Sequence, residues 1–149
     1  MTEILIRNAE RVVTMDDNRT EIHAGDVLIR GGRIAAVGQG LTPEGEVIDA
    51  AGCVVTPGLV NTHHHLYQTL TRAVPAAQDA LLFGWLSTLY PIWARFGPEH
   101  MHVSAQVGLA ELALSGCTLT SDHLYLFPNG ARLDDTIAAA REVGLRFHP

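Results

Sequence analysis

Thr56-Pro-Gly-Leu-Val-Asn-Thr-His-His-His65 combines a proline–glycine turn, a short apolar run and three consecutive histidines. The apolar run from Cys53 to Val60 has the length of a strand, and its position beside a turn signal predicts that the strand is buried. Because side chains alternate between the faces of a strand, His63 and His65 are predicted to point the same way. Two imidazoles so placed can bind one divalent metal ion, with zinc as the first expectation and iron as the alternative. A strand that simply ends in surface histidines would give the same pattern.

The second half of the chain alternates between helical and strand patterns. Gly97-Pro-Glu99 has the features of a helix start, with proline in the first helical position and an acid in the first turn. Cys117-Thr-Leu-Thr-Ser121 predicts a strand, and Asp134 or Asp135 is expected to cap a last helix that stops at Gly144. This alternation indicates strand–helix units around a parallel sheet, that is, an α/β fold. The apolar residues at helical spacing after the first helix start are Val103, Val107, Ala110 and Leu114.

The first 55 residues have a different pattern, with short β-rich runs separated by turns. Asp26-Val-Leu-Ile-Arg30 and Arg33-Ile-Ala-Ala-Val37 flank Gly31-Gly32. Two glycines between β-rich runs predict a hairpin, because both accept a positive φ. Residues 1–55 are therefore assigned to a small β unit and residues 56–149 to the strand–helix units. By itself the β unit would have a structural role and no chemistry.

Composition and charge exclude several classes of protein. The 149 residues are 47% hydrophobic and 17% charged, which is typical of a globular protein. The net charge is -6 and the chain contains no lysine and no basic cluster, so nucleic acid is not expected as a partner. There is no leader pattern and no apolar run long enough to cross a bilayer, so a cytoplasmic protein without membrane contact is expected. Cys53 and Cys117 lie in apolar runs and are predicted to be two buried, reduced thiols.

Residues 57–65 resemble the first-strand metal motif of the amidohydrolase superfamily, with His63 and His65 at the two ligand positions and His64 between them. The resemblance implies a metal-dependent hydrolase built on a TIM-like (β/α)8 barrel, preceded by part of a small β-sandwich over residues 1–55. A complete barrel takes about 250 residues, so the chain is expected to be an N-terminal fragment in which residues 56–149 form the first βα units. In this family the other metal ligands and the general acid and base come from later strands. The catalytic residues are therefore expected after Pro149 and have no assignment.

A wider likeness narrows the position within the superfamily to one branch, that of bacterial 8-oxoguanine deaminases and hydroxyatrazine ethylaminohydrolases. The segments that resemble this branch are residues 61–73, 88–95, 114–118 and 122–128. Leu124 departs from the pattern, because the branch is expected to have a second histidine after His123. The departure bears on the substrate and leaves the metal assignment unchanged.

The activity implied by this resemblance is hydrolysis of a carbon–nitrogen bond other than a peptide bond. Deamination of 8-oxoguanine or a similar amino-bearing oxo-heterocycle is the first expectation, so the partner is a small heterocyclic molecule. A triazine aminohydrolase of the hydroxyatrazine type and an adenosine-type deaminase are the alternatives among enzymes. A non-catalytic relative that uses the barrel for assembly is the alternative outside enzymes, but such relatives usually lose ligands, and His63 and His65 are both present. Assembly into a homo-oligomer stays open.

Three residues are predicted to contact the substrate, because segments after strand ends form the active-site face of a parallel barrel. Gln68 lies three residues past His65, although a helix start with solvent-facing polar residues would look alike. Trp85 lies in an aromatic-rich stretch and could stack on a flat ring, with burial in the core as the alternative. His123 follows the second strand, at the same end as His65. It would either line the pocket or bind backbone.

Overall fold

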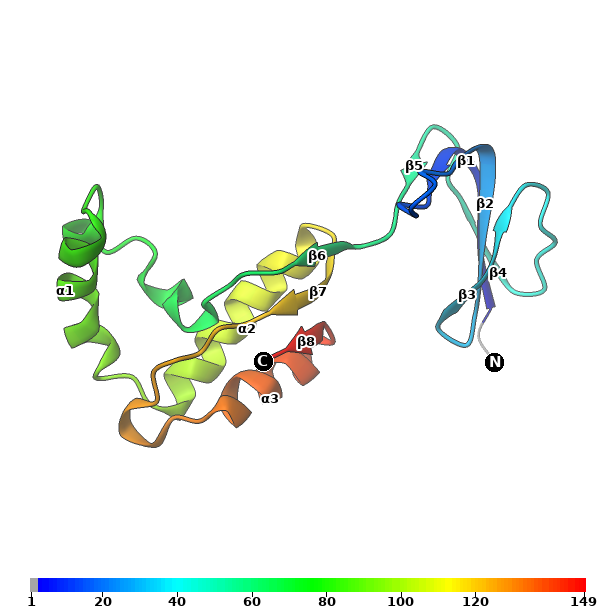
Figure 1. Cartoon of the computed structure of the whole chain (residues 1–149). Helices are drawn as coiled ribbons and strands as arrows, with labels where there is room; N and C mark the ends of the chain where they lie inside the picture. The colour runs from blue at the N-terminus through cyan, green and yellow to red at the C-terminus, as the bar shows by residue number, and fades with distance from the viewer. Residues whose placement is uncertain (1–2) are drawn as a thin grey trace. The chain divides into compact units, whose positions relative to one another are not determined.

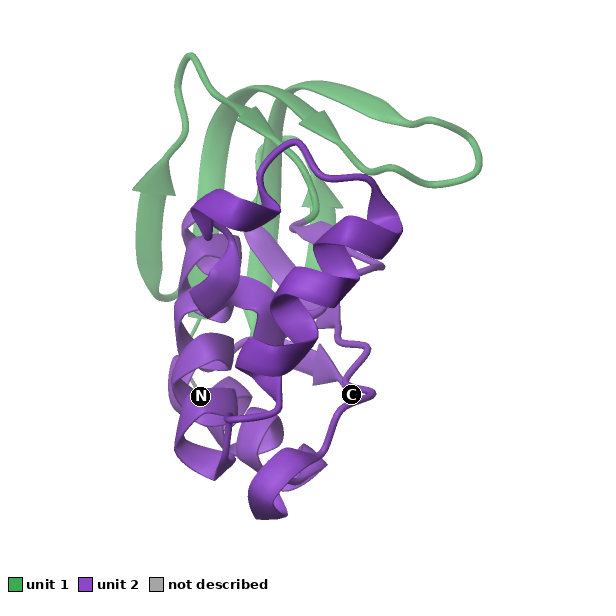
Figure 2. Ribbon diagram, turned by 90° about the vertical axis from the view of Figure 1, so that its left-hand side faces the viewer, with its two compact units in different colours: residues 1–57 green, residues 58–149 purple. Residues whose placement is uncertain are grey.

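The computed structural model describes residues 3–149, which fold into two compact units (Figure 1). The first unit extends to Pro57 and the second spans Gly58–Pro149, coloured green and purple in Figure 2. In the described part of the chain, the regular structure of the first unit consists of strands. The second unit combines three strands with helices.

The first unit is a mixed sheet. Its strands are β1 (Glu3–Val13), β2 (Glu21–Arg30), β3 (Arg33–Gly38), β4 (Glu46–Asp49) and β5 (Val54–Val55). The order is β3-β2-β1-β4, and β5 also pairs with β1. The pairs β1–β2 and β2–β3 are antiparallel, whereas β4 and β5 run parallel to β1. These strands form one sheet, so the second sheet of the expected β-sandwich is not found among residues 3–57.

The predicted hairpin is confirmed. Arg30 pairs with Arg33 across the turn, and Gly31 and Gly32 have φ values of 56° and 75°. Both glycines therefore occupy the left-handed region that a two-residue hairpin turn requires, and a β-carbon would be strained there.

The second unit has three parallel strands in the order β6 (Leu59–Asn61), β7 (Cys117–Ser121) and β8 (Arg146–His148). Helix α2 (Pro98–Leu114) precedes β7, helix α3 (Leu133–Val143) precedes β8, and the two helices pack on each other (Figure 1). This arrangement confirms the predicted strand–helix units and the α/β class. The remaining elements are α1 (Leu82–Trp93) and the 3₁₀ helices η1 (Leu66–Thr71), η2 (Pro75–Ala77) and η3 (Pro128–Gly130).

The helix ends agree with the predictions at Pro98 and Gly144 and differ at Asp135. Pro98 begins α2 as predicted, and Gly116 and Gly144 follow α2 and α3 with φ values of 87° and 82°. However, α3 begins at Leu133, so Asp135 lies in the first turn and is not the N-cap. Its carboxylate still accepts a hydrogen bond from the Arg132 backbone N–H at 2.7 Å. Asp135 therefore caps the helix from its third position, because an acidic side chain at that position can accept a hydrogen bond from the backbone N–H of the N-cap residue.

The run from Cys53 to Val60 does not form one buried strand, which corrects the sequence prediction. Pro57 separates β5 from β6, and the two short strands belong to different sheets. Proline interrupts the run because it has no N–H to continue a strand ladder. Val60 is 56% exposed in β6, and Cys53 is also exposed, so only Cys117 is the buried thiol that was expected.

The buried face of α2 is also not the one that the apolar spacing suggested. Val103 and Leu114 are 39% and 90% exposed. The buried residues of α2 are Met101, Ser104, Ala105, Gly108 and Leu109. The small residues of this face allow a close approach of η1, since a β-carbon on Gly108 would lie 2.9 Å from Thr69 Oγ1. The packing partner therefore selects a face with small side chains over one with larger apolar residues.

Short 3₁₀ helix η1 is anchored on both sides by buried side chains. Tyr67 and Trp93 are fully buried with their rings 5.2 Å apart, and Trp93 Nε1 donates a hydrogen bond to Thr71 Oγ1 at 3.0 Å. Ser104 Oγ of α2 donates to the Leu66 carbonyl at 2.7 Å. These contacts fix the backbone that follows the three histidines.

No helix in residues 3–149 combines the length and the apolar character that a membrane span requires.

Expressed alone, residues 1–149 are expected to associate and to lack a sharp unfolding transition. β6 has a strand neighbour on one side only, and its Leu59 and Val60 side chains are more than half exposed, as is Leu114 of α2. Open strand edges and exposed apolar patches of this kind promote aggregation. Thermal unfolding and sedimentation velocity would measure this, and a soluble monomer with one cooperative transition would contradict it.

Candidate active site

The three histidines lie between the end of β6 at Asn61 and the start of η1 at Leu66. The His63 and His65 rings meet edge to face, with their centroids 4.8 Å apart and their planes at 90°. The two imidazoles therefore lie side by side, although residues 62–65 follow the end of β6 and do not belong to the strand on which the prediction rested. Their role as metal ligands stays a prediction.

One hydrogen bond determines which nitrogen of His65 is available. His65 Nδ1 lies 2.9 Å from the backbone carbonyl oxygen of His123. Because a carbonyl oxygen only accepts, Nδ1 carries the proton and donates, and Nε2 of the neutral ring keeps its lone pair. Histidines that bind metals are usually oriented by such a bond from the other ring nitrogen. His65 therefore fits a metal ligand through Nε2.

The end of β7 holds the histidine segment through two further hydrogen bonds. The His123 backbone N–H donates to the His64 carbonyl at 2.8 Å. The Leu66 N–H donates to Asp122 Oδ1 at 2.9 Å. Asp122 is buried, and this burial raises the pKa of its carboxyl while the Leu66 N–H opposes the shift. The chain before and after His65 is therefore fixed by residues that directly follow β7.

His64 has a different environment from its two neighbours. Its Cε1 would lie 3.8 Å from a β-carbon on Gly108, so its ring lies against α2. Burial lowers the pKa of His64, and the charge of the nearby Arg72 guanidinium lowers it further. The ring is therefore neutral at physiological pH, and its Nδ1 is buried without a hydrogen-bond partner in the described part of the chain.

Two tyrosines and a glutamine lie next to His65. Gln68 Nε2 donates to the Tyr67 hydroxyl at 3.0 Å and to the Tyr125 hydroxyl at 3.4 Å. The Tyr125 ring lies 5.4 Å from the rings of His65, His123 and Tyr67. Tyr125 is 36% exposed, whereas Tyr67 is fully buried. These residues and three histidines are called the histidine–tyrosine cluster, which comprises His63, His65, Tyr67, Gln68, His123 and Tyr125.

The structure brings two of the three predicted substrate contacts to this cluster. Gln68 belongs to it through the two phenols, and the His123 ring lies 5.3 Å from the His65 ring. Trp85 instead packs on Trp93 at 5.3 Å, at the edge of the apolar core. Tyr125 was missed by the sequence analysis, although its place two residues after His123 at a strand end was the available signal.

The donor set in this chain is incomplete for a metal ion. Across residues 3–149, no group of three or more His, Cys, Asp or Glu side chains is placed to hold one. Zinc in a catalytic site takes three protein ligands, and histidine nitrogen is among its usual donors. The residues present thus fit a partial zinc site made of His63 and His65.

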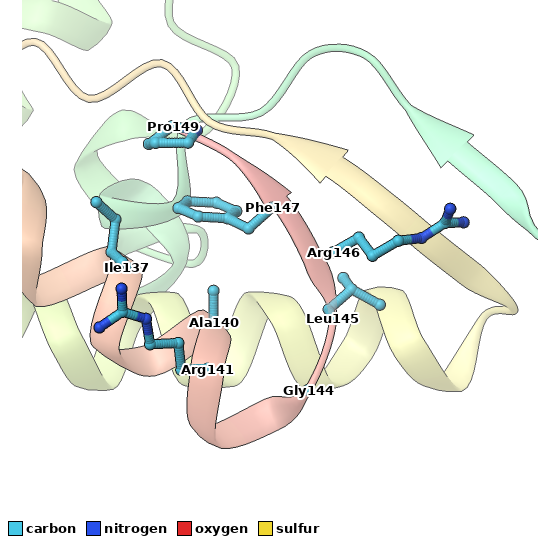
Figure 3. Close-up of a pocket in the computed structure, with 8 residues that line it drawn as sticks. All are labelled: Ile137, Ala140, Arg141, Gly144, Leu145, Arg146, Phe147 and Pro149. Atoms are coloured by element: carbon cyan, nitrogen blue, oxygen red, sulfur yellow. The ribbon is translucent and has the colours of Figure 1, made fainter. Parts of the chain in front are cut away.

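A separate pocket lies between α3 and β8 (Figure 3). It is lined by residues that include Ile137 and Arg141 of α3 and Phe147 of β8. None of the residues that line it belongs to the histidine–tyrosine cluster, so this pocket is not the predicted active site.

The chain is similar in sequence to one protein family and to several known enzymes. Residues 54–148 match the protein family described as Amidohydrolase family. The chain is 48% identical to 8-oxoguanine deaminase from Pseudomonas aeruginosa over 83% of its own length and 29% of that protein. It is 33% identical to hydroxydechloroatrazine ethylaminohydrolase from Pseudomonas sp. strain ADP, over 99% of the chain and 34% of that protein.

A solved structure is similar over almost the whole chain. Atrazine chlorohydrolase from Arthrobacter aurescens TC1, complexed with zinc, is 36% identical with a TM-score of 0.89, over 97% of this chain and 34% of that one. The chain thus spans about a third of the length of the relatives that it matches.

Proposed function

Since the chain belongs to the amidohydrolase family, we propose that the full-length protein is a metal-dependent hydrolase that deaminates an amino-bearing oxo-heterocycle, with 8-oxoguanine as the first candidate. The observation that carries the proposal is the fixed tautomer of His65 beside the polar Gln68 side chain. The name of the relative at 48% identity supports the choice of substrate. We further propose that the three parallel strands begin a (β/α)8 barrel and that the first unit is part of a β-sandwich.

The residues of this chain have separate roles in the proposed reaction. His63 and His65 would hold a zinc ion, which when bound supplies water activation near neutral pH. The bond to the His123 carbonyl keeps His65 in the tautomer that this role needs. The Gln68 carboxamide would orient the ring of the substrate, and the His123 side chain would line the pocket beside it. The remaining ligands and the general acid and base are expected in later strands of the full-length protein.

A triazine aminohydrolase is the second candidate, and two similarities favour it. The hydroxydechloroatrazine ethylaminohydrolase and the zinc-containing atrazine chlorohydrolase are both more than 30% identical to the chain.

Leu124, the position at which the sequence departs from the pattern of this branch, is 9% exposed and packs in the apolar core with Tyr67 and Trp93. The departure therefore lies in the apolar core that also holds Tyr67, the buried member of the histidine–tyrosine cluster.

Replacing Gln68 with leucine is expected to lower kcat/KM for 8-oxoguanine by at least about ten-fold, which equals about 1.4 kcal/mol. A carboxamide can bind the polar edge of an oxopurine, and a site built around such bonds discriminates strongly once they are lost. Ammonia release by the full-length enzyme would measure the effect, and the zinc content should not change.

The matched control is Gln106→Leu, because Gln106 bonds to Glu142 and lies outside the cluster. That variant should retain the parental kcat/KM. Equal activity of the Gln68 variant and the parent would contradict the role of Gln68, and a preference for a hydroxytriazine would contradict the choice of substrate.

A further inference from the structure

The nitrogen of the Gln68 carboxamide lies against two phenols. Gln68 Nε2 donates to Tyr67 at 3.0 Å and more weakly to Tyr125 at 3.4 Å. The two phenols therefore occupy the nitrogen side of the carboxamide. Among residues 3–149, no hydrogen bond to Gln68 Oε1 is found, and the side chain is only half-buried. The group that Gln68 can offer to a ligand is therefore its carbonyl oxygen.

The two phenols are firmly placed. Tyr67 is fully buried, and its ring packs on Trp93 with the ring centroids 5.2 Å apart. Tyr125 packs edge-on against His65 and His123, at 5.4 Å from each. The carboxamide thus has a fixed orientation close to the predicted metal ligand.

We propose that Tyr67 and Tyr125 are positioning residues that hold the Gln68 carboxamide with its oxygen towards the substrate, so that the site selects heterocycles with a ring N–H. This inference rests on the proposed function, because it concerns the substrate class of the same site. A carbonyl oxygen accepts a hydrogen bond from the N–H of a lactam ring such as that of 8-oxoguanine. It repels the lone pair of an unprotonated ring nitrogen such as those of adenosine. The phenols therefore favour oxopurine-like rings over adenosine-type rings.

The test measures binding of 8-oxoguanine and of its singly N-methylated analogues to the full-length protein after zinc removal, by calorimetry. In the parent, one methylated position is expected to weaken binding by at least about thirty-fold, because it removes the N–H that Gln68 accepts. In Tyr125→Phe, which removes only the hydroxyl, the penalty at that position should fall to about three-fold or less. Tyr67→Phe is expected to act in the same direction.

Tyr90→Phe is the matched control, since Tyr90 packs on Trp93 and, among residues 3–149, is not one of the hydrogen-bond partners of the Gln68 carboxamide. It should keep the parental selectivity, and thermal unfolding of each variant would verify folding. If Tyr125→Phe and Tyr67→Phe weaken all analogues equally, the phenols have a merely structural role and the inference is wrong. A parent that shows no penalty for any methylated position also overturns it.

Activity measurements on the zinc-loaded parent separate this inference from the proposed function. A protein that selects the ring N–H in binding but releases no ammonia from 8-oxoguanine would contradict the proposed substrate and retain the role of the phenols. A protein that deaminates 8-oxoguanine with unchanged selectivity in both tyrosine variants would contradict only the role of the phenols.

Discussion

Replacing His63 and His65 together with alanine is expected to remove bound zinc from the full-length protein and to lower kcat/KM by about 10³-fold or more, that is, by about 4 kcal/mol. The two rings lie 4.8 Å apart, and His65 has its Nδ1 proton fixed on the His123 carbonyl. The double variant removes the two proposed metal donors. In the proposed reaction, water activation depends on the metal ion, so activity should fall with metal content.

Elemental analysis of the purified variant and ammonia release would measure the two effects. His23→Ala is the control, because His23 is an exposed histidine of β2 in the first unit. It should retain both zinc and activity. Zinc content that is unchanged in the double variant would show that His63 and His65 are not the ligands.

Replacing Asp122 with alanine is expected to weaken zinc binding by about ten- to a hundred-fold and to destabilise the protein by about 1–3 kcal/mol. Asp122 Oδ1 accepts the hydrogen bond of the Leu66 N–H, one residue after His65, and both residues are buried. Alanine would leave that N–H buried without a partner. The backbone that carries His65 would then lose one of the bonds that fix it.

Asp122→Asn tests this mechanism, because the amide oxygen can replace Oδ1 as the acceptor and should restore most of both losses. Asp134→Ala is a surface control, since Asp134 forms an exposed ion pair with Arg132. Its effect on stability should stay within about 1 kcal/mol. Urea unfolding and zinc competition with a chelator would measure the variants. Normal zinc affinity in Asp122→Ala would exclude a positioning role for this carboxylate.

The structural features that could be predicted from the sequence alone are local ones, because residues adjacent in the chain determine them. The hairpin follows from Gly31-Gly32, whose conformational freedom is a property of the two residues. The start of α2 at Pro98 and the glycines after α2 and α3 follow from local backbone chemistry in the same way. The spacing of His63 and His65 is likewise local, but the two residues follow the end of β6, so their adjacent rings are not a result of strand alternation. Such features need no knowledge of the rest of the fold.

The tertiary structure alone decided the features that depend on which segments meet. The apolar residues of α2 lie on more than one face, and only contact with η1 shows that the face of Gly108 is the buried one. The division of the run around Pro57 likewise became visible only from strand pairing. The tautomer of His65 and the orientation of Gln68 depend on His123 and Tyr125, which are more than 50 residues away in sequence. The local sequence shows which chemical groups are present. The hydrogen bonds that orient those groups join segments that are distant in sequence, and only the packing of β6 beside β7 brings these segments together.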